Sequence, residues 1–282
     1  MKIGIAGLGL IGGSMAKAYR EFSDADDLGY EIYGYNRSKS ITDFAILQGV
    51  LDGALDESTI SECDLIFIGL YPVSSIEYME KIAPLVKKSA FIIDLCGTKK
   101  EICRAGFSLA EKYGFTFVGG HPMAGTHFSG YKYSKSTMFH GAPMVIVPPR
   151  FDDIALLDKI KRLLEPAGFG KFSFTTADEH DRMIAFTSQL AHVVSNAYVK
   201  SPTAKNHKGF SAGSYKDMTR VAWLNEKMWT ELFFENKEPL LYEIDEIISS
   251  LTEYRDALAT GDKEKMQEIL KAGRIAKEEI DG

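Results

Sequence analysis

The chain has 282 residues, of which 45% are hydrophobic and 26% are charged, a composition typical of globular proteins with a sizeable core. Its formal net charge of −6 at pH 7 argues against a nucleic-acid partner, which would require a basic face. No apolar run reaches the roughly 18 residues of a membrane helix, and glycine spacing explains the apolar N-terminal stretch better than a secretion signal does.

The first part of the chain alternates β-rich runs with helical patterns, which predicts a parallel sheet with crossover helices. The expected strands are Lys2–Gly7, Glu31–Tyr35, Asp64–Leu70, Ala90–Leu95, Thr116–Gly120, Met144–Val147 and Lys171–Thr175. The expected helices between them are Ile11–Phe22, Ser74–Val86, Lys99–Tyr113 and Asp153–Leu164.

Strand signals stop near Thr176, where we place a domain boundary. The later segments all favour helices: Ala177–Lys200, Asp217–Leu224, Glu226–Asn236, Glu238–Leu258 and Asp262–Glu279. The polar segment Ser201–Ser214 is expected to be a loop. One helix carries an apolar stripe at helical spacing, made of Ile244, Ile247, Ile248, Leu251, Tyr254 and Leu258. This stripe indicates either core packing or a subunit interface.

The first strand runs into Gly7, Gly9 and Gly12, the Gly-x-Gly-x-x-Gly spacing of a dinucleotide-binding turn. Gly7 permits a tight turn, Gly9 lets the backbone approach a pyrophosphate, and Gly12 allows close packing of helix on strand. With Leu10 and Ile11, these glycines form the expected cofactor site, because a helix N-terminus favours negative charge. The alternative is a glycine-rich turn that binds nothing.

The second strand ends in Asn36, Arg37, Ser38 and Lys39 rather than in an acidic residue. We expect Asn36, Arg37 and Ser38 to lie beside the adenosine ribose of the cofactor. Asn36 can hydrogen-bond the ribose of NAD, whereas Arg37 and Lys39 could attract the 2′-phosphate of NADP. The choice between NAD and NADP stays open, and a solvated basic turn is the alternative interpretation.

His121 follows an apolar strand directly and precedes a turn rich in proline and glycine. In open α/β sheets, ligands bind beyond the carboxyl ends of strands, where the segment Asp94–Lys99 also lies. A neutral imidazole there can accept a proton, and a nearby nicotinamide would make the chemistry a hydride transfer. The fold class is therefore α/β, with a Rossmann-type dinucleotide-binding domain (residues 1–175) and an all-helical domain (residues 176–282).

The chain resembles the prephenate/arogenate dehydrogenase family of tyrosine biosynthesis over nearly its whole length, with the motifs in the family's order. The motifs are the turn Gly7–Ser14, His121-Pro-Met-Ala-Gly125, Ser188-Gln-Leu-Ala-His192, Asp217-Met-Thr-Arg220 and Met228–Asn236. The resemblance implies a helical dimerisation domain, a homodimer, and oxidative decarboxylation of prephenate with hydride transfer to NAD or NADP.

The resemblance also implies roles for individual residues. His121 would accept the proton of the substrate hydroxyl, and Arg220 would hold a substrate carboxylate. Ser188 and His192 would line the substrate site, with His192 meeting the polar side chain, and Gly213 would bring backbone close to the substrate. The alternatives are a surface or interdomain salt bridge for Arg220, core or capping roles for Ser188 and His192, and a plain loop glycine at 213.

Two positions depart from the family's pattern. The family commonly has a serine beside the catalytic histidine, where this chain has Gly97, so Thr98, Cys96 or a water would have to orient His121. Thr98 is the expected catalytic residue there. The family also often has an acid where this chain has His127.

Three other functions stay open. The substrate could be arogenate, which carries an amino acid side chain in place of the keto acid. The chain could be a 6-phosphogluconate-type hydroxyacid or imine reductase, which shares the Rossmann-plus-helical layout. It could also be a non-catalytic sensor that binds NAD(P).

Three cysteines, Cys63, Cys96 and Cys103, lack the Cys-x-x-Cys spacing of a zinc or redox site. Such a set is typical of free thiols in a reducing compartment. We therefore expect a cytoplasmic protein with no metal site and with neither nucleic acid nor membrane as a partner.

Overall fold

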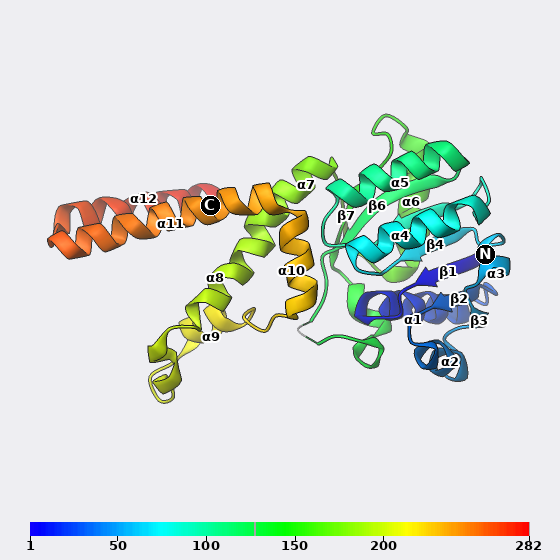
Figure 1. The fold of residues 1–282 in the computed structure, drawn as a ribbon, viewed down its shortest axis with the longest axis horizontal. Coiled ribbons are helices and arrows are strands. Elements are labelled where there is room, and N and C mark those ends of the chain that lie inside the picture. The colour runs from blue at the N-terminus through cyan, green and yellow to red at the C-terminus, as the bar shows by residue number, and fades with distance from the viewer. Residues whose placement is uncertain (127, 282) are drawn as a thin grey trace.

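A computed structural model describes residues 1–126 and 128–281, arranged as a sheet-containing half and a helical half (Figure 1). His127, the second departure from the family's pattern, lies outside the described residues. The strands are β1 (Lys2–Ala6), β2 (Glu31–Tyr35), β3 (Gly53–Ala54), β4 (Leu65–Ile68), β5 (Phe91–Asp94), β6 (Thr116–Pro122), β7 (Pro143–Val147) and β8 (Lys171–Phe174).

The sheet-containing half holds the first six helices. They are α1 (Leu10–Ala25), α2 (Lys39–Leu47), α3 (Glu57–Ile60), α4 (Pro72–Ile82), α5 (Lys100–Tyr113) and α6 (Ile154–Leu164). Short 3₁₀ segments occupy Ala83–Leu85, Tyr131–Tyr133, Ser136–Phe139 and Glu165–Ala167. The alternation of strand and helix predicted from the sequence is confirmed, although β3, α2 and α3 were not among the expected elements.

The eight strands form one sheet in the order β3-β2-β1-β4-β5-β6-β7-β8. Neighbouring strands are parallel except for β6 and β7, which are antiparallel. The expected end of β6 at Gly120 is wrong, because pairing with β7 extends the strand to Pro122 and sets His121 opposite Val145. His121 therefore lies within a strand rather than after it.

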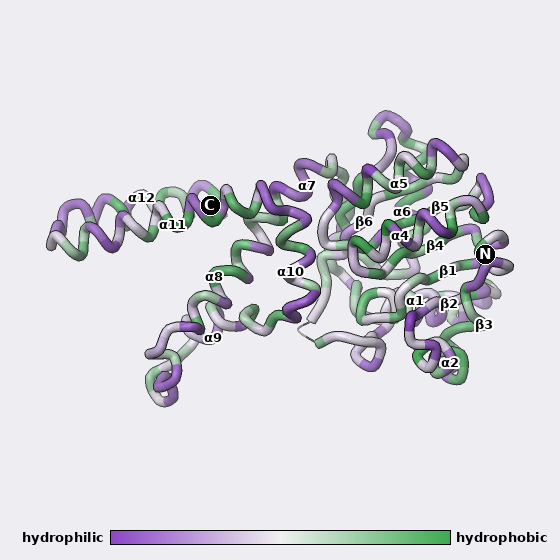
Figure 2. Tube along the Cα trace, in the orientation of Figure 1, coloured by the Kyte–Doolittle hydropathy of each residue, from purple (hydrophilic) through white to green (hydrophobic). Residues whose placement is uncertain are grey.

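Alternation along the strands builds a core on each face of the sheet, as expected for a parallel sheet covered on both sides. On β4, Leu65 and Phe67 face one cluster, which includes Tyr19 of α1. Ile66 and Ile68 face the other cluster, which includes residues of α4 and α5. Apolar (green) segments run through the sheet-containing half in Figure 2. Packing on both faces fixes the positions of the central strands, at whose carboxyl ends the site lies.

The helical half consists of α7 (Ala177–Ile184), a π-helical segment (Ala185–Leu190), α8 (Ala191–Tyr198), α9 (Gly213–Thr219), α10 (Glu226–Glu235), α11 (Lys237–Thr260) and α12 (Lys263–Asp281). The single helix expected over Ala177–Lys200 is thus interrupted by a π-helical segment. The helix expected over Asp217–Leu224 is wrong, because α9 begins at Gly213 and ends at Thr219. The predicted loop Ser201–Ser214 contains a short 3₁₀ segment, Pro202–Asn206, and its end forms the start of α9.

Helices α11 and α12 form a hairpin that extends away from the rest of the chain (Figure 1). Half of the apolar stripe on α11 is exposed there: Ile248 is 55% exposed, Leu251 59% and Leu258 73%, while Ile244, Ile247 and Tyr254 are half-buried. Within the described part of the chain, no helix has the length and apolarity needed to cross a bilayer.

Candidate active site

The glycine turn between β1 and α1 is built from backbone packed against backbone. Gly7 has φ = +98°, and a Cβ there would lie 2.5 Å from the carbonyl oxygen of Gly69. A Cβ at Gly12 would lie 1.9 Å from the carbonyl oxygen of Gly7, so only glycine fits either position. At Gly9, by contrast, a Cβ would meet no described atom within 4 Å, which leaves this backbone open to a ligand.

The N-terminus of α1 fits a pyrophosphate. No side chain caps this 16-residue helix, and its first turn, which includes Leu10 and Ile11, contains no acidic residue. Backbone N–H groups at such a terminus attract anions. The turn predicted from glycine spacing therefore has the shape and polarity that a dinucleotide requires.

The polar turn after β2 differs in part from its predicted use. The Asn36 side chain accepts a hydrogen bond from the Leu8 backbone N–H (3.2 Å) and donates one to the Ser38 carbonyl (3.3 Å), so it stabilises the glycine turn itself. Arg37, Ser38 and Lys39 are exposed. The cationic side chains of Arg37 and Lys39 make no ion pair among the described residues. They are thus available to an anionic group near the ribose.

His121 begins a chain of three side chains that connects β6 to α7. Nδ1 of His121 lies 2.9 Å from Nε2 of His180, and Nδ1 of His180 lies 2.7 Å from a carboxylate oxygen of Asp181. His180 and Asp181 are each only 2% exposed. Burial lowers the pKa of His121 well below its usual value, and the neighbouring His180 and Lys99 lower it further. Burial also lowers the pKa of His180. Both rings are therefore neutral at pH 7.

The two residues proposed to replace the family serine make other contacts. The Thr98 hydroxyl donates to Glu235 (3.4 Å), and the Cys96 thiol lies 3.4 Å from the Ser75 hydroxyl. Burial raises the pKa of the Cys96 thiol to about 12, so it stays protonated. A catalytic role for Thr98 remains a prediction that no described contact with His121 supports.

Gly97 leaves the other ring nitrogen of His121 accessible. A Cβ at position 97 would lie 3.9 Å from Nε2 of His121 and 3.4 Å from Cδ2 of Leu232. A serine hydroxyl at this position would thus be within reach of Nε2. In this chain the space beside Nε2 is bounded by glycine and by an apolar side chain of α10.

A buried ion pair supports the loop before α5. The Lys99 ammonium and the Asp94 carboxylate are both fully buried and in contact. Asp94 also accepts hydrogen bonds from the backbone N–H groups of Cys96 (2.9 Å) and Gly120 (3.0 Å). Burial is the largest influence on Lys99 and lowers its pKa, but the Asp94 carboxylate together with the neighbouring Cys96 and Cys103 raises the pKa overall. The pair ties the end of β5 to β6 beside His121.

His192 lies on α8, with its ring oriented by the preceding turn. Its Nδ1 donates to the backbone carbonyl of Ser188 (2.8 Å), which leaves Nε2 without a proton in the neutral ring. The ring lies against the Trp229 indole, with centroids 4.0 Å apart. Burial lowers the pKa of His192, and the nearby Arg220 lowers it further. The contact with Ser188 is to its backbone, and a shared face for the two side chains stays a prediction.

Arg220 and Gly213 lie at the two ends of α9. The Arg220 guanidinium is exposed, lies close enough to His192 to influence its pKa, and forms no ion pair with any described carboxylate. Gly213 starts the helix, and a Cβ there would meet no described atom within 4 Å. The cation therefore lies near His192 at the C-terminal end of α9, and the open backbone of Gly213 lies at the other end of that helix.

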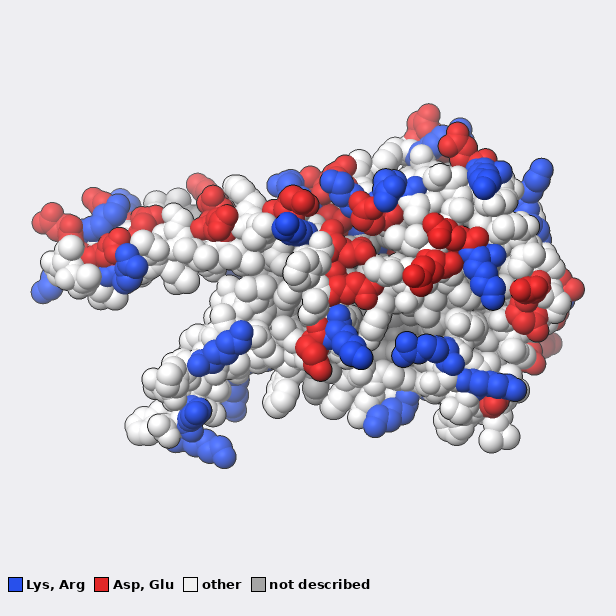
Figure 3. Space-filling view, viewed as in Figure 1, with Lys and Arg blue, Asp and Glu red and all other residues white. Residues whose placement is uncertain are grey.

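Helix α10 connects the His121 region to the His192 region. Leu232 lies beside Gly97 and His121, while Trp229, three residues earlier, contacts His192. Residues three apart share a helix face and are separated by about 4.5 Å of rise. The position of α10 is fixed by Gln189 of the π-helical segment, which donates to the Leu232 carbonyl (3.1 Å) and accepts from Asn236 (2.8 Å). Acidic side chains gather where this helical half meets the sheet-containing half (Figure 3).

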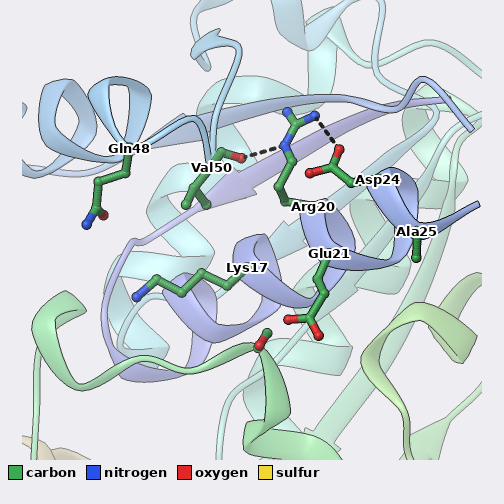
Figure 4. A pocket seen from close by; sticks show the side chains of 8 residues that line it. Lys17, Arg20, Glu21, Asp24, Ala25, Gln48 and Val50 are labelled. Atoms are coloured by element: carbon green, nitrogen blue, oxygen red, sulfur yellow. Dashed lines mark hydrogen bonds and ion pairs between the residues drawn. The ribbon is translucent and has the colours of Figure 1, made fainter. Parts of the chain in front are cut away.

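A groove of about 670 Å³ lies along the later turns of α1, away from these residues. Figure 4 shows its charged side chains, including Arg20, which contacts Asp24 and the Val50 carbonyl. Lys17 donates to the Ser134 carbonyl (2.9 Å). Both cations of the groove, Lys17 and Arg20, therefore already have hydrogen-bond partners.

Comparison with known proteins follows the same division of the chain. Residues 25–171 match the prephenate dehydrogenase nucleotide-binding domain, and residues 176–272 match the prephenate dehydrogenase dimerization domain. The chain belongs to the prephenate dehydrogenase family. The resemblance read from the motifs is thereby confirmed, as is the α/β fold with a helical second domain.

Individual members of the prephenate dehydrogenase family match almost the whole chain. The prephenate dehydrogenase of Lactococcus lactis subsp. cremoris (strain MG1363) is 30% identical, covering 97% of this chain and 75% of that protein. A crystal structure of prephenate dehydrogenase from A. aeolicus with hydroxyphenyl propionate and NAD+ has a TM-score of 0.83 and 27% identity, covering 100% and 98% of the two chains. Synechocystis arogenate dehydrogenase has a TM-score of 0.79 and 25% identity, covering 99% of this chain and all of that one.

Sequence reasoning missed His180 and Asp181. Their only signal is a polar pair in the first turns of a helix capped by Thr176, whose hydroxyl accepts from the Glu179 backbone N–H (3.2 Å). Such a pattern is typical of any helix N-terminus. Nothing in it indicates that the histidine faces His121, 59 residues away in the chain.

Proposed function

We propose that the chain converts prephenate to 4-hydroxyphenylpyruvate and carbon dioxide, with hydride transfer to NAD or NADP, as a step of tyrosine biosynthesis. One observation carries this proposal. Nε2 of His121 lies beside Gly97 and Leu232, on the side of α10 where Trp229 contacts His192, and Arg220, which has no ion pair with a described carboxylate, lies near His192.

The nicotinamide, when bound, accepts the hydride from the hydroxyl-bearing ring carbon of the substrate. Loss of hydride and of carbon dioxide makes the ring aromatic, so the reaction is effectively irreversible. The substrate hydroxyl becomes acidic as hydride leaves, and Nε2 of His121 takes up its proton. Such general-base assistance is typically worth about 10²–10⁴ in rate.

Arg220 supplies the charge that selects the substrate. A guanidinium without a carboxylate partner can form paired hydrogen bonds with a substrate carboxylate. The same cation beside His192 disfavours an ammonium group there, so we propose the keto acid prephenate before arogenate. Ser188 and Gly213 would complete the lining of the substrate site.

For the cofactor, we propose that Gly7, Gly9, Leu10, Ile11 and Gly12 receive the pyrophosphate. Arg37 and Ser38 would meet the ribose, while Asn36 supports the turn and offers its remaining hydrogen-bonding capacity. This site belongs to residues 1–175, and residues 176–282 would supply substrate contacts and the subunit interface.

We also propose a homodimer in the cytoplasm. The exposed stripe on α11 is a surface that a second copy would cover, because apolar faces of this extent are costly in water. The three cysteines are free and buried, which suits a reducing compartment.

The test is an absorbance assay of nicotinamide reduction by the purified protein, with prephenate or arogenate and with NAD or NADP. Turnover of prephenate with at least one cofactor is the expected result. Faster turnover of arogenate than of prephenate would identify arogenate as the substrate. Tight cofactor binding without turnover of either compound would favour the sensor or reductase alternatives.

A further inference from the structure

The described contacts give His180 and Asp181 a direct connection to the proposed base. The two residues lie on α7, whereas His121 lies on β6, so the connection crosses from the helical half to the sheet-containing half. Two buried polar side chains aligned on one imidazole require a physical explanation, because buried polar groups are costly unless each is hydrogen-bonded.

The hydrogen bonds fix which nitrogen carries each proton. Asp181 accepts hydrogen bonds from the backbone N–H groups of Lys99 (2.7 Å) and Lys100 (2.8 Å), so its carboxylate must also accept from Nδ1–H of His180. Neutral His180 then has a lone pair at Nε2, which accepts from Nδ1–H of His121. Consequently Nε2 of His121 has no proton and faces the space beside Gly97.

Asp181 is held rigidly enough to impose this order. Its two carboxylate oxygens contact the start of α5, where the helix dipole favours a negative charge. Its backbone carbonyl accepts from the Asn236 side chain (2.8 Å). Both ends of the residue are therefore fixed by elements other than its own helix.

We propose that His180 and Asp181 are positioning residues that hold His121 with Nε2 unprotonated and stabilise the positive charge formed when Nε2 accepts the substrate proton. The inference rests on the proposed function. In the step itself the substrate O–H bond breaks and an Nε2–H bond forms on His121. The proton on Nδ1 stays in, or shifts along, the hydrogen bond to His180, and the three residues pass from net negative to neutral.

The other charged groups near His121 and His180 do not stabilise a positive charge on His121 in the way that Asp181 does. Lys99 lowers the pKa of both histidines, while its partner Asp94 raises that of His180. The half-buried Glu235 has a raised pKa because of burial and the nearby Glu231, and its carboxylate accepts from Thr98. Asp181 is thus the only described carboxylate that hydrogen-bonds either histidine. This arrangement also explains how His121 can be oriented although Gly97 has no hydroxyl.

The first measurement is ¹⁵N NMR of the imidazole nitrogens in the full-length protein without substrate. His121 is expected to carry its proton on Nδ1. In His180→Phe, which removes the acceptor, the Nδ1 preference is expected to be lost. A wild-type His121 protonated on Nε2 would overturn the proposal, and this readout requires no turnover, so it is independent of the proposed function.

The second measurement compares steady-state kinetics of three variants with the wild type. His180→Phe is expected to lower kcat at least 100-fold while the Kd of the cofactor changes less than threefold. His180→Gln restores an acceptor for Nδ1 without a titratable ring and should recover at least tenfold of that loss. Asp181→Asn should lower kcat at least tenfold with KM changed less than threefold.

Glu179→Gln is the matched control for Asp181→Asn, because Glu179 is an exposed acid on the same helix that pairs with Arg182. Its kcat should equal that of the wild type. Thermal unfolding identifies any variant that fails to fold, in which case His180→Gln and the wild-type NMR spectrum decide. A wild-type kcat in folded His180→Phe would refute the inference, whereas an inactive wild type would refute only the proposed function.

Discussion

The Trp229 indole lies over the His192 imidazole, with ring centroids 4.0 Å apart and planes inclined by 32°. The stacking holds a neutral histidine against α10 with its Nε2 available to a ligand. Aromatic pairs of this kind contribute about 0.5–1.5 kcal/mol beyond burial. We therefore expect Trp229→Leu to raise the KM for prephenate roughly two- to tenfold, with Trp229→Phe nearer the wild type. An unchanged KM in Trp229→Leu would show that the stacking is structural.

Arg220→Ala should weaken substrate binding while leaving cofactor binding unchanged. A hydrogen bond to a charged group contributes about 1.5–3 kcal/mol, so the KM should rise roughly ten- to hundredfold. Arg220→Lys should recover only part of this, because an ammonium cannot make paired hydrogen bonds. Lys216→Ala, an exposed cation on the same helix, is the control. Equal KM values in Arg220→Ala and the control would remove Arg220 from the site.

His121→Asn should lower kcat by about 10²–10⁴ while the cofactor Kd stays near that of the wild type. Stopped-flow or steady-state absorbance measures the first quantity, and fluorescence titration with the reduced cofactor measures the second. Turnover at the wild-type rate would exclude His121 as the proton acceptor.

The pH dependence of kcat follows from the lowered pKa of His121. Only the neutral ring accepts a proton, and burial beside His180 and Lys99 keeps it neutral at a pH below its usual pKa of about 6.5. Activity should therefore persist as the pH falls through 6.5 and decline only below it. An acidic limb centred at or above 6.5 would contradict this assignment.

Lys99→Met should destabilise the fold strongly, because it leaves the Asp94 carboxylate buried without its partner. Breaking a buried ion pair in this way costs about 3–5 kcal/mol of the free energy of unfolding, measured by urea titration. The adjacent Lys100 provides the control, since its ion pair with Asp178 is exposed and Lys100→Met should leave the urea midpoint unchanged. Equal midpoints for the two variants would show that the buried pair contributes nothing.

Arg37→Ala tests the cofactor preference. If Arg37 meets a 2′-phosphate, the variant should lose affinity for NADP at least tenfold while its affinity for NAD is unchanged. Parallel titrations of wild type and variant with both cofactors measure the ratio. If the variant keeps the wild-type ratio of affinities for NADP and NAD, Arg37 does not meet the 2′-phosphate and is a solvated residue of the turn.

The sequence predicted best those features that depend on local pattern. The continuous apolar run of β4 and the spacing of Gly7, Gly9 and Gly12 are local patterns, so strand and turn were correctly placed. The end of β6 depends on an antiparallel partner more than 20 residues later, and the extension to Pro122 was therefore missed.

The site was predictable only where a motif carries it. His121 and His192 lie in recognisable motifs. The proposed role of His180, by contrast, depends on its contact with His121 in the other half of the chain. The π-helical segment is similar in kind, because Gln189 is turned inward by its bonds to Leu232 and Asn236 rather than by helical periodicity. Packing between distant elements decides these positions.

The antiparallel pairing of β6 with β7 places the proposed base in a strand, with its backbone fixed opposite Val145. The chain leaves the sheet only after Pro122, so substitutions in the loop that begins at Met123 need not displace the imidazole. The proposed substrate contacts His192 and Arg220 lie on helical elements outside this strand, so they can change independently of the residue that removes the proton. A lineage carrying this fold could exchange one substrate for the other while conserving its reaction.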